Sequence, residues 1–274
     1  MMNASSGLYD RRIWIGLLFL AVIIGAVFFI IQDIASDSDQ DLRPELLVMS
    51  SIPLQWGDAT MAQIASGEAE PSPLFKTLSA SNTLTLIDDV HRLGKSGKAP
   101  LLLVQPRALA PTELVVLDDW VRKGGTAIVF ADPALDWPSD MPLGDQRRPL
   151  FTSLLNPLFR HWGVELALPV ADEEAVVATT VGKYAISLKS PGIWVLPKNS
   201  KATARCNIRK DERMAVCAVG KGKALLVADA DMLQEALWTD TVLTSGTMAW
   251  VQDVIASSRS KVSYPGTLWE IQGN

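Results

Sequence analysis

Cysteine and histidine are the side chains from which a nucleophilic active site would most readily be built, and the chain holds two of each. A catalytic cysteine sits on a strained turn between a strand and a helix, with a histidine beside it. Cys206 and Cys217 do not follow a strand into a helix, and neither lies in a G-x-C-x-G pattern. His91 and His161 lie on or at the end of expected helices, where a structural role is ordinary. The sequence therefore predicts no catalytic residue and no enzyme.

The two cysteines are candidates for a disulfide instead. Both flank the charged segment 209–213, which we interpret as the solvated tip of a β-hairpin over residues 203–219. Such a hairpin places Cys206 and Cys217 almost opposite one another, and cross-strand Cβ atoms lie about 4.5–5.5 Å apart, close to the spacing of a disulfide. An oxidising compartment would keep the bond. The alternative is a pair of reduced, buried cysteines.

Three acids could contact a ligand. Asp132, Asp229 and Asp231 each come after an expected parallel strand, and open α/β sheets bind ligands outside the carboxyl ends of their strands. A metal ion or a sugar phosphate would suit carboxylates there. The alternative is that these side chains cap the following turns by accepting main-chain N–H bonds. Both interpretations stay open.

Other cofactor and nucleic-acid signals are missing from the sequence. The turn Gly220–Lys223 lacks the spacing of a phosphate-binding loop and the Ser or Thr that follows its lysine. A formal net charge of −5 and an isoelectric point near 5.1 argue against a nucleic-acid partner, because phosphate binding needs a cationic surface. We therefore expect no cofactor, no metal centre and no nucleic acid.

The elements that would position these residues follow an α/β pattern. Residues 101–104 and 126–131 read as buried strands, and the helix between them begins at Ala110-Pro111 and ends before Gly124-Gly125. Further short apolar runs at 45–51, 83–87 and 224–228 complete a mainly parallel sheet of flavodoxin or amidotransferase type. We expect flanking helices, strands at 176–188 and 193–196, and the 203–219 hairpin as an insertion.

The N-terminal part carries the strongest single signal. Residues 13–31 are uncharged over 19 positions, which is long enough for a helix that crosses a bilayer core of about 30 Å. Arg11 and Arg12 precede the run, and acidic residues follow it, so the positive-inside rule places the N-terminus in the cytoplasm. A cleaved signal peptide is the alternative, with a shorter apolar core as a rule.

We therefore predict a single-pass inner-membrane protein with a periplasmic or otherwise extracytoplasmic C-terminal domain. The expected segments are a cytoplasmic N-terminus at 1–12, a transmembrane helix at 13–31, an acidic linker at 32–43, an extracytoplasmic α/β domain at 44–257 and a C-terminal tail at 258–274.

Several motifs carry a resemblance to a known family. They are Leu101–Pro106, Leu114–Trp120, Gly124-Gly125, Phe130–Pro133, Gly220–Ala224 and Ala228–Leu233. With them, residues 45–256 resemble the GldG-like group associated with ABC transport systems, which is related to DUF4350 proteins. The resemblance implies a glutamine-amidotransferase-like α/β fold without its enzyme chemistry. Members of the wider group often have further membrane spans, whereas one is expected here, which favours an accessory or scaffold role.

Two functions follow as hypotheses. The first is a non-enzymatic extracytoplasmic domain that binds a protein partner in an ABC-type transport or envelope assembly, with the lipid bilayer contacted through residues 13–31. The alternative is a small-ligand-binding or hydrolytic α/β domain that uses the acids at the strand ends.

Overall fold

The computed structural model describes residues 43–260 except 58, 96, 146, 169–175, 199–200 and 238–244, and it also describes Trp269. The chain divides into two units, Met1–Arg43 and Pro44–Asn274, and the account below concerns the second. The predicted transmembrane helix at 13–31, the linker and most of the C-terminal tail lie outside the described residues. Within the described part, no helix is both long and apolar enough to span a bilayer.

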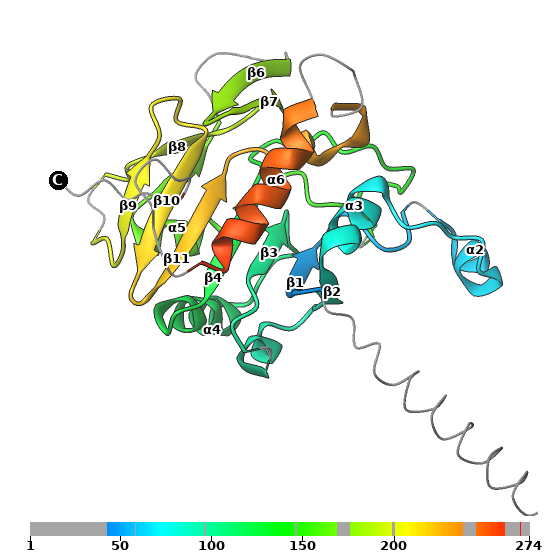
Figure 1. Ribbon diagram of the computed structural model, residues 1–274, viewed down its shortest axis with the longest axis horizontal. Helices are drawn as coiled ribbons and strands as arrows, with labels where there is room; N and C mark the ends of the chain where they lie inside the picture. Colours follow the sequence, from blue (N-terminus) through cyan, green and yellow to red (C-terminus); the bar gives the residue numbers. More distant parts are fainter. Residues whose placement is uncertain are drawn as a thin grey trace, which may run out of the picture. The chain divides into compact units, whose positions relative to one another are not determined.

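A seven-stranded sheet forms the centre of the second unit (Figure 1). Its strands are β1 Glu45–Ser50, β2 Thr83–Leu86, β3 Leu101–Val104, β4 Thr126–Phe130, β9 Arg205–Ile208, β10 Met214–Val219 and β11 Gly222–Val227. They lie in the order β2-β1-β3-β4-β11-β10-β9. The first five are parallel. At one edge β10 is antiparallel to β11, and β9 is antiparallel to β10. The expectation of a mixed α/β domain with a mostly parallel sheet is confirmed.

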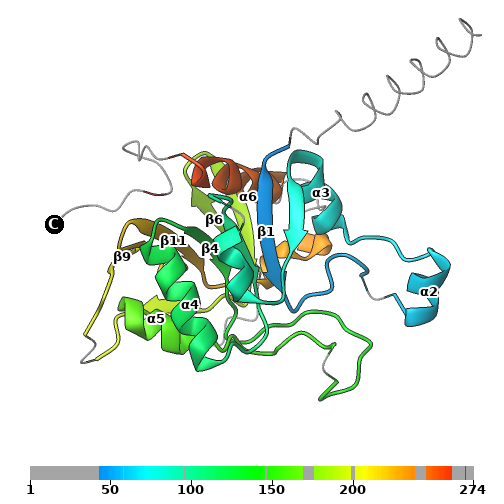
Figure 2. The ribbon, with the colours of Figure 1, turned by 90° about the horizontal axis from the view of Figure 1, so that it is seen from below.

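The helices cover both faces of this sheet. The helices of the described residues are α2 Met61–Ser66, α3 Pro73–Ser81, α4 Pro111–Arg122, α5 Asn156–Trp162 and α6 Ser245–Ser258, with shorter 3-10 helices η1 Val90–Lys95, η2 Asp231–Leu233 and η3 Glu235–Leu237. Helix α2 stands apart from the sheet and covers neither face (Figures 1 and 2). Figure 2 shows α3 and α6 on one side of the sheet and α4 and α5 on the other. Alternate strand residues point into two cores, Leu46 and Val48 toward α3 and α6, Leu47 and Met49 toward α4 and α5. Burial on both faces explains why these strands are continuous apolar runs.

The crossover between β3 and β4 follows the sequence expectation closely. Pro111 stands in the first turn of α4, and Glu113 accepts the main-chain N–H of Ala110 at 2.8 Å, which caps the helix start. Gly125 lies against the ring of Trp120, where a Cβ would approach ring carbons at 2.6 Å. Only a glycine fits between the end of α4 and the start of β4.

Two predictions about strands are corrected by the structure. Residues 176–188 were expected to form one strand, but β6 Val176–Val181 and β7 Tyr184–Lys189 pair as an antiparallel hairpin, with Gly182 at φ 60° in the turn. The apolar pattern continues on both sides of Gly182, so periodicity alone does not reveal the turn. The hairpin of β9 and β10 is not an insertion, because β10 pairs with β11 and extends the main sheet. A small sheet pairs β5 Glu165–Ala167 with β8 Ile193–Val195.

Candidate functional site

The carboxyl ends of the parallel strands gather the acids that the sequence singled out. Asp132 lies two residues after the end of β4, and its side chain is fully buried. One carboxyl oxygen accepts the main-chain N–H of Ala134 at 2.8 Å, and the other accepts that of Ala230 at 3.1 Å. The second bond ties the loop after β4 to the loop after β11. A carboxyl group that accepts main-chain N–H groups on both oxygens is typical of a side chain that stabilises turns.

Asp229 makes a similar connection from the end of β11, and it too is fully buried. Its Oδ2 accepts the main-chain N–H of Lys189 at 2.7 Å, and its Oδ1 accepts that of Met232 at 2.9 Å. The first bond reaches the end of β7, and the second closes the turn that leads into η2. Asp229 therefore fastens the β6–β7 hairpin to the end of the central sheet.

Asp231 lies two residues further on, at the start of η2. Its Oδ2 accepts the main-chain N–H of Asp136 at 2.8 Å, and its Oδ1 accepts the side-chain amide of Gln234 at 2.5 Å. The same amide nitrogen donates to the carbonyl of Asp136 at 2.9 Å. Asp231 and Gln234 together hold the loop that follows β4 in place.

Burial changes the protonation of all three acids. Loss of hydration, with a smaller contribution from the charge of Asp231, raises the pKa of Asp132 to about 7. Burial also raises the pKa of Asp229 well above its ordinary value and raises that of Asp231. Among the described residues, no three His, Cys, Asp or Glu side chains are arranged to hold a metal ion. The hydrogen bonds favour a turn-stabilising role, and ligand binding by these acids stays a prediction.

Gln105 is a member of this cluster that the sequence analysis did not single out. It follows β3 with φ 39°, and it is fully buried. Its side-chain amide accepts the main-chain N–H of Asp132 at 2.9 Å and donates to the carbonyls of Asp132 and Leu150 at 3.2 and 2.9 Å. Its own carbonyl accepts the hydroxyl of Ser51 at 2.5 Å. The sequence signal for Gln105 is its position as a polar residue between a buried strand and Pro106. Its hydrogen-bond partners lie far along the chain, so the sequence does not identify them.

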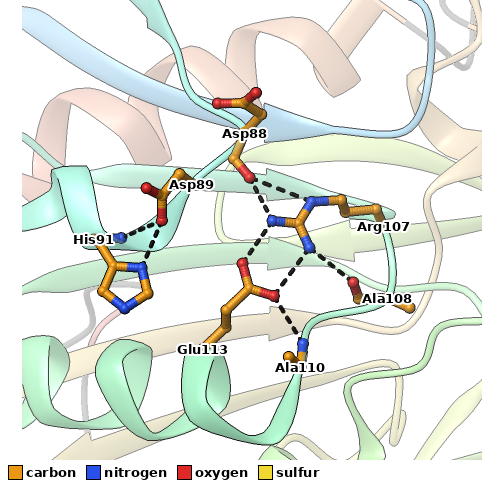
Figure 3. A network of polar contacts seen from close by, with 7 residues as sticks. All are labelled: Asp88, Asp89, His91, Arg107, Ala108, Ala110 and Glu113. Atoms are coloured by element: carbon orange, nitrogen blue, oxygen red, sulfur yellow. Dashed lines mark hydrogen bonds and ion pairs between the residues drawn. The ribbon is translucent and has the colours of Figure 1, made fainter.

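A second polar network lies where β2 and β3 end (Figure 3). The guanidinium group of Arg107 forms two hydrogen bonds to the carboxylate of Glu113, at 2.6 and 3.0 Å, and this pairing lowers the pKa of Glu113. Arg107 also donates to the main-chain carbonyl of Asp88, whose side chain points away. Nearby, Asp89 accepts from the ring of His91 at 2.7 Å. The network joins the loop after β2 to the start of α4, which is a structural role.

The cysteines and His161 lie away from these strand ends. Cys206 and Cys217 occupy opposed positions on β9 and β10 and are joined in a disulfide. His161 lies on α5, with its Nε2 3.5 Å from Asp118 and 3.3 Å from Arg122. Neither histidine lies beside a thiol, because both cysteine side chains are engaged in the disulfide.

A cleft opens beside the acids, with a volume of about 500 Å³. Its walls come from the segment after β1, the start of α3, the loop after β4 and the η2–η3 region. It is lined by Pro53, Gly57, Glu70, Pro71, Ser72, Pro73, Leu74, Lys76, Trp137, Pro138, Leu233, Gln234, Glu235 and Ala236. A mainly apolar cleft with a few polar groups at this end of an α/β sheet is the usual place for a ligand. A larger hollow of about 720 Å³ lies around β5 and β8, and none of the three acids lines it.

The comparison with known families bears on this domain directly. Residues 75–182 match a family described as "ABC-type uncharacterized transport system". The match runs from α3 to the end of β6 and so includes β3, α4 and β4. It supports an association with ABC-type transport. A comparison with curated proteins gives no match.

Solved structures show only a distant likeness. The mmIFT52 N-terminal domain is 12% identical, with 80% of this chain and 100% of that chain covered and a TM-score of 0.46. Cytoplasmic Protein STM1381 from Salmonella typhimurium LT2 is 12% identical over 68% of this chain and 86% of that one, with a TM-score of 0.44. The β-galactosidase Gan42B is 10% identical, and the alignment spans 78% of this chain but 30% of the enzyme, with a TM-score of 0.45. Likeness at this level assigns no function.

Proposed function

We propose that this chain is a membrane-anchored, non-enzymatic accessory subunit of an ABC-type transport system, whose extracytoplasmic α/β domain binds a protein partner. The observation that carries the proposal is the match of residues 75–182 to the ABC-type transport family. The sequence adds the apolar run at 13–31, which would anchor the domain.

The chemistry of the described residues supports a binding role. The two cysteines are joined to each other and supply no thiol. The buried acids at the strand ends are hydrogen-bonded to the main chain on both carboxyl oxygens or to a neighbouring amide. A disulfide at the sheet edge also suits an oxidising compartment outside the cytoplasm.

The finer assignment is to the GldG-like and DUF4350-related group with an amidotransferase-like fold. The order β2-β1-β3-β4, with a parallel strand beyond it, supports this assignment, because doubly wound sheets of flavodoxin type have such an order. The inner-membrane location and the cytoplasmic N-terminus belong to the same proposal.

The test is affinity isolation of the full-length chain from detergent-solubilised membranes, followed by mass spectrometry of the proteins that accompany it. We expect ATPase or membrane subunits of an ABC-type transport system. An unrelated chain of the same topology, expressed at the same level, is the control. Recovery of no transport or envelope component would reject the proposed function.

One observation favours the alternative, a small-ligand-binding or hydrolytic domain. A carboxyl group such as that of Asp132, with a pKa of about 7, is what a general acid needs near neutral pH. Under this alternative, Asp132→Asn would abolish ligand binding or turnover while the protein stays folded. Under the proposed function, the same folded variant would recover the partner proteins as the unchanged chain does.

A further inference from the structure

The two ends of the central sheet differ in the charge that they present. The five parallel strands, β2, β1, β3, β4 and β11, all begin at one end, here called the amino end. Strand β9 begins there too, because it is antiparallel to β10, which is itself antiparallel to β11. The six residues of β1 or of β11 separate the two ends by about 20 Å. Charges are screened over about 8 Å at physiological ionic strength, so each end acts on a partner through its own charge.

The described segments that enter the strands at the amino end contain cations and no acid. They are residues 43–44 before β1, 82 before β2, 97–100 before β3, 123–125 before β4, 201–204 before β9 and 220–221 before β11. Their charged residues are Arg43, Lys98, Lys123, Lys201 and Lys221. Arg205 is the first residue of β9, and Arg259 donates to the main-chain carbonyl of Glu45 at 3.2 Å, so both lie at the same end.

The segments that leave the strands at the opposite, carboxyl end are mostly acidic. Their acids are Asp88 and Asp89 after β2, Asp132, Asp136 and Asp140 after β4, and Asp229, Asp231 and Glu235 after β11. Two cations at this end are paired with carboxylates, Arg107 with Glu113 at 2.6 Å and Lys189 with Asp136 at 2.7 Å. The turn 209–213 between β9 and β10 contains charges of both signs. The positive excess is therefore confined to the amino end.

Part of this positive charge has an ordinary explanation within the fold. Cations complement the partial negative charge of a helix C-terminus, and α4 and α6 both end here. This accounts for Lys123, which pairs with Asp119 at 3.6 Å, and for Arg259, which donates to the carbonyl of Ile255 at 3.1 Å. Four exposed cations remain, and no described carboxylate forms an ion pair with any of them. These four are here called the basic surface: Lys98, Lys201, Arg205 and Lys221.

The basic surface extends across the sheet from β3 to β9. These strands are four places apart in the strand order, which corresponds to about 19 Å. The main-chain N–H of Lys221 donates to the carbonyl of Arg122 at 2.9 Å, and that of Thr203 donates to the carbonyl of His161 at 3.0 Å. Both segments are therefore tied to the ends of helices. Cations spread over this width suit several negatively charged groups side by side better than one small anion.

The path of the chain indicates which anions lie close to this end. Strand β1 begins at the amino end with Glu45, and the apolar run that we propose as the anchor ends at residue 31. Residues 32–44 between them span at most about 45 Å when fully extended. The tether of an anchored domain is thus attached at the same end as the basic surface, and it keeps that end near the bilayer at a high effective concentration.

We infer that the basic surface contacts the anionic phospholipid headgroups of the membrane that holds the chain. This inference rests on the proposed function, because it needs the anchor, and it adds an orientation: the carboxyl end, with the acids and the cleft, faces away from the bilayer. Each Lys or Arg near an anionic membrane strengthens binding roughly fivefold, so four of them suffice to orient a tethered domain. The acids of residues 33–41 are other anions close to this end in the sequence, and the test separates them from lipid.

Fluorescence quenching in the full-length chain tests the orientation. The chain is inserted into nanodiscs of phosphatidylcholine, with or without phosphatidylglycerol, that contain a quencher on some lipid headgroups. A fluorophore is attached to Ala202→Cys at the amino end or to Ala134→Cys at the carboxyl end; both positions are exposed, and the disulfide protects the native cysteines. With phosphatidylglycerol we expect quenching at position 202 to be roughly fivefold stronger than at position 134, and salt to remove the difference.

Neutral substitutions identify the cations responsible. The test variant combines Lys201→Gln, Arg205→Gln and Lys221→Gln. The matched control combines Arg92→Gln, Lys183→Gln and Lys210→Gln, which also removes one arginine and two lysines from exposed positions, outside the basic surface. We expect the test variant to lose the quenching that phosphatidylglycerol adds at position 202, and the control to keep it. Circular dichroism establishes that both variants fold.

The outcomes separate this inference from the proposed function. Equal quenching at position 202 with and without phosphatidylglycerol would overturn the inference and favour the acids of residues 33–41 as the anions at this end. An equal loss in the test variant and the control would also overturn it, because the effect would then follow the net charge. Neither result affects the proposed function, which the recovery of transport components tests. If the full-length chain does not insert into nanodiscs, the anchor fails, and the inference fails with it.

Discussion

At the residue scale, the buried carboxyl group of Asp132 makes the stability of the domain depend on pH. Its pKa is about 7 in the folded chain and near 3.8 in the unfolded chain. Between these values the folded chain holds a proton that the unfolded chain has released, so the free energy of unfolding falls as pH rises. The expected loss between pH 4 and pH 7 is on the order of a few kcal/mol, and Asp229 and Asp231 act in the same direction. Denaturant unfolding across this range measures it.

The variant Asp132→Asn tests this assignment. It should flatten the dependence of the free energy of unfolding on pH. It should also lower the stability at pH 4.5, because the main-chain N–H of Ala134 or Ala230 then faces the amide NH2 of asparagine, which is itself a donor. Asp145→Asn is the matched control. Arg147 holds the pKa of Asp145 at about 2, so that carboxylate does not titrate within the measured range. An unaltered pH slope in Asp132→Asn would contradict the assignment.

At the element scale, the contact between α4 and β11 depends on the absence of a side chain at Gly222. A Cβ there would lie 2.1 Å from the carbonyl oxygen of Val121 and 2.3 Å from that of Gly125. Both neighbours are main-chain atoms, so Gly222→Ala should force the helix and the strand apart and cost about 1–3 kcal/mol or more. Gly94→Ala is the control, because a Cβ at Gly94 meets no atom within 4 Å. Equal stabilities of the two variants would show that the contact is adaptable.

The disulfide at the sheet edge is a second element-scale feature. It closes a loop between residues separated by 11 positions, and disulfides stabilise small domains by about 2–4 kcal/mol. Reductant should lower the unfolding midpoint of the unchanged chain to that of the Cys206→Ala, Cys217→Ala variant. The variant itself should not respond to reductant. An alkylating agent added before cell lysis reacts only with reduced cysteines. Alkylation of Cys206 and Cys217 would therefore indicate that the bond does not form in the cell.

At the scale of the whole molecule, the apolar run at 13–31 and the two preceding arginines make location a testable property. We expect the full-length chain to remain in the membrane fraction after alkaline washing, and a reporter at its C-terminus to be active outside the cytoplasm. Substituting Arg11 and Arg12 by glutamate should weaken this orientation. Recovery of the full-length chain in the soluble fraction, or a cytoplasmic reporter, would contradict the anchored topology.

The sequence by itself determined the elements whose signals are local. The buried strands, the α4 crossover with its proline start and glycine end, and the 203–219 hairpin all follow from periodicity and from turn residues read within short windows. The opposition of Cys206 and Cys217 belongs to this class, because a hairpin register depends on neighbouring residues. Local hydrogen bonding and side-chain burial specify such elements before any distant contact forms.

Only the tertiary structure decided which distant residues meet. Asp132 and Ala230 bond across 98 positions, and Gln105 reaches two loops that no periodicity connects to it. The cleft likewise arises from segments after β1, β4 and β11. Whether an acid at a strand end is buried depends on how loops pack over it. That packing depends on apolar contacts between residues far apart in the sequence, which a local pattern does not record.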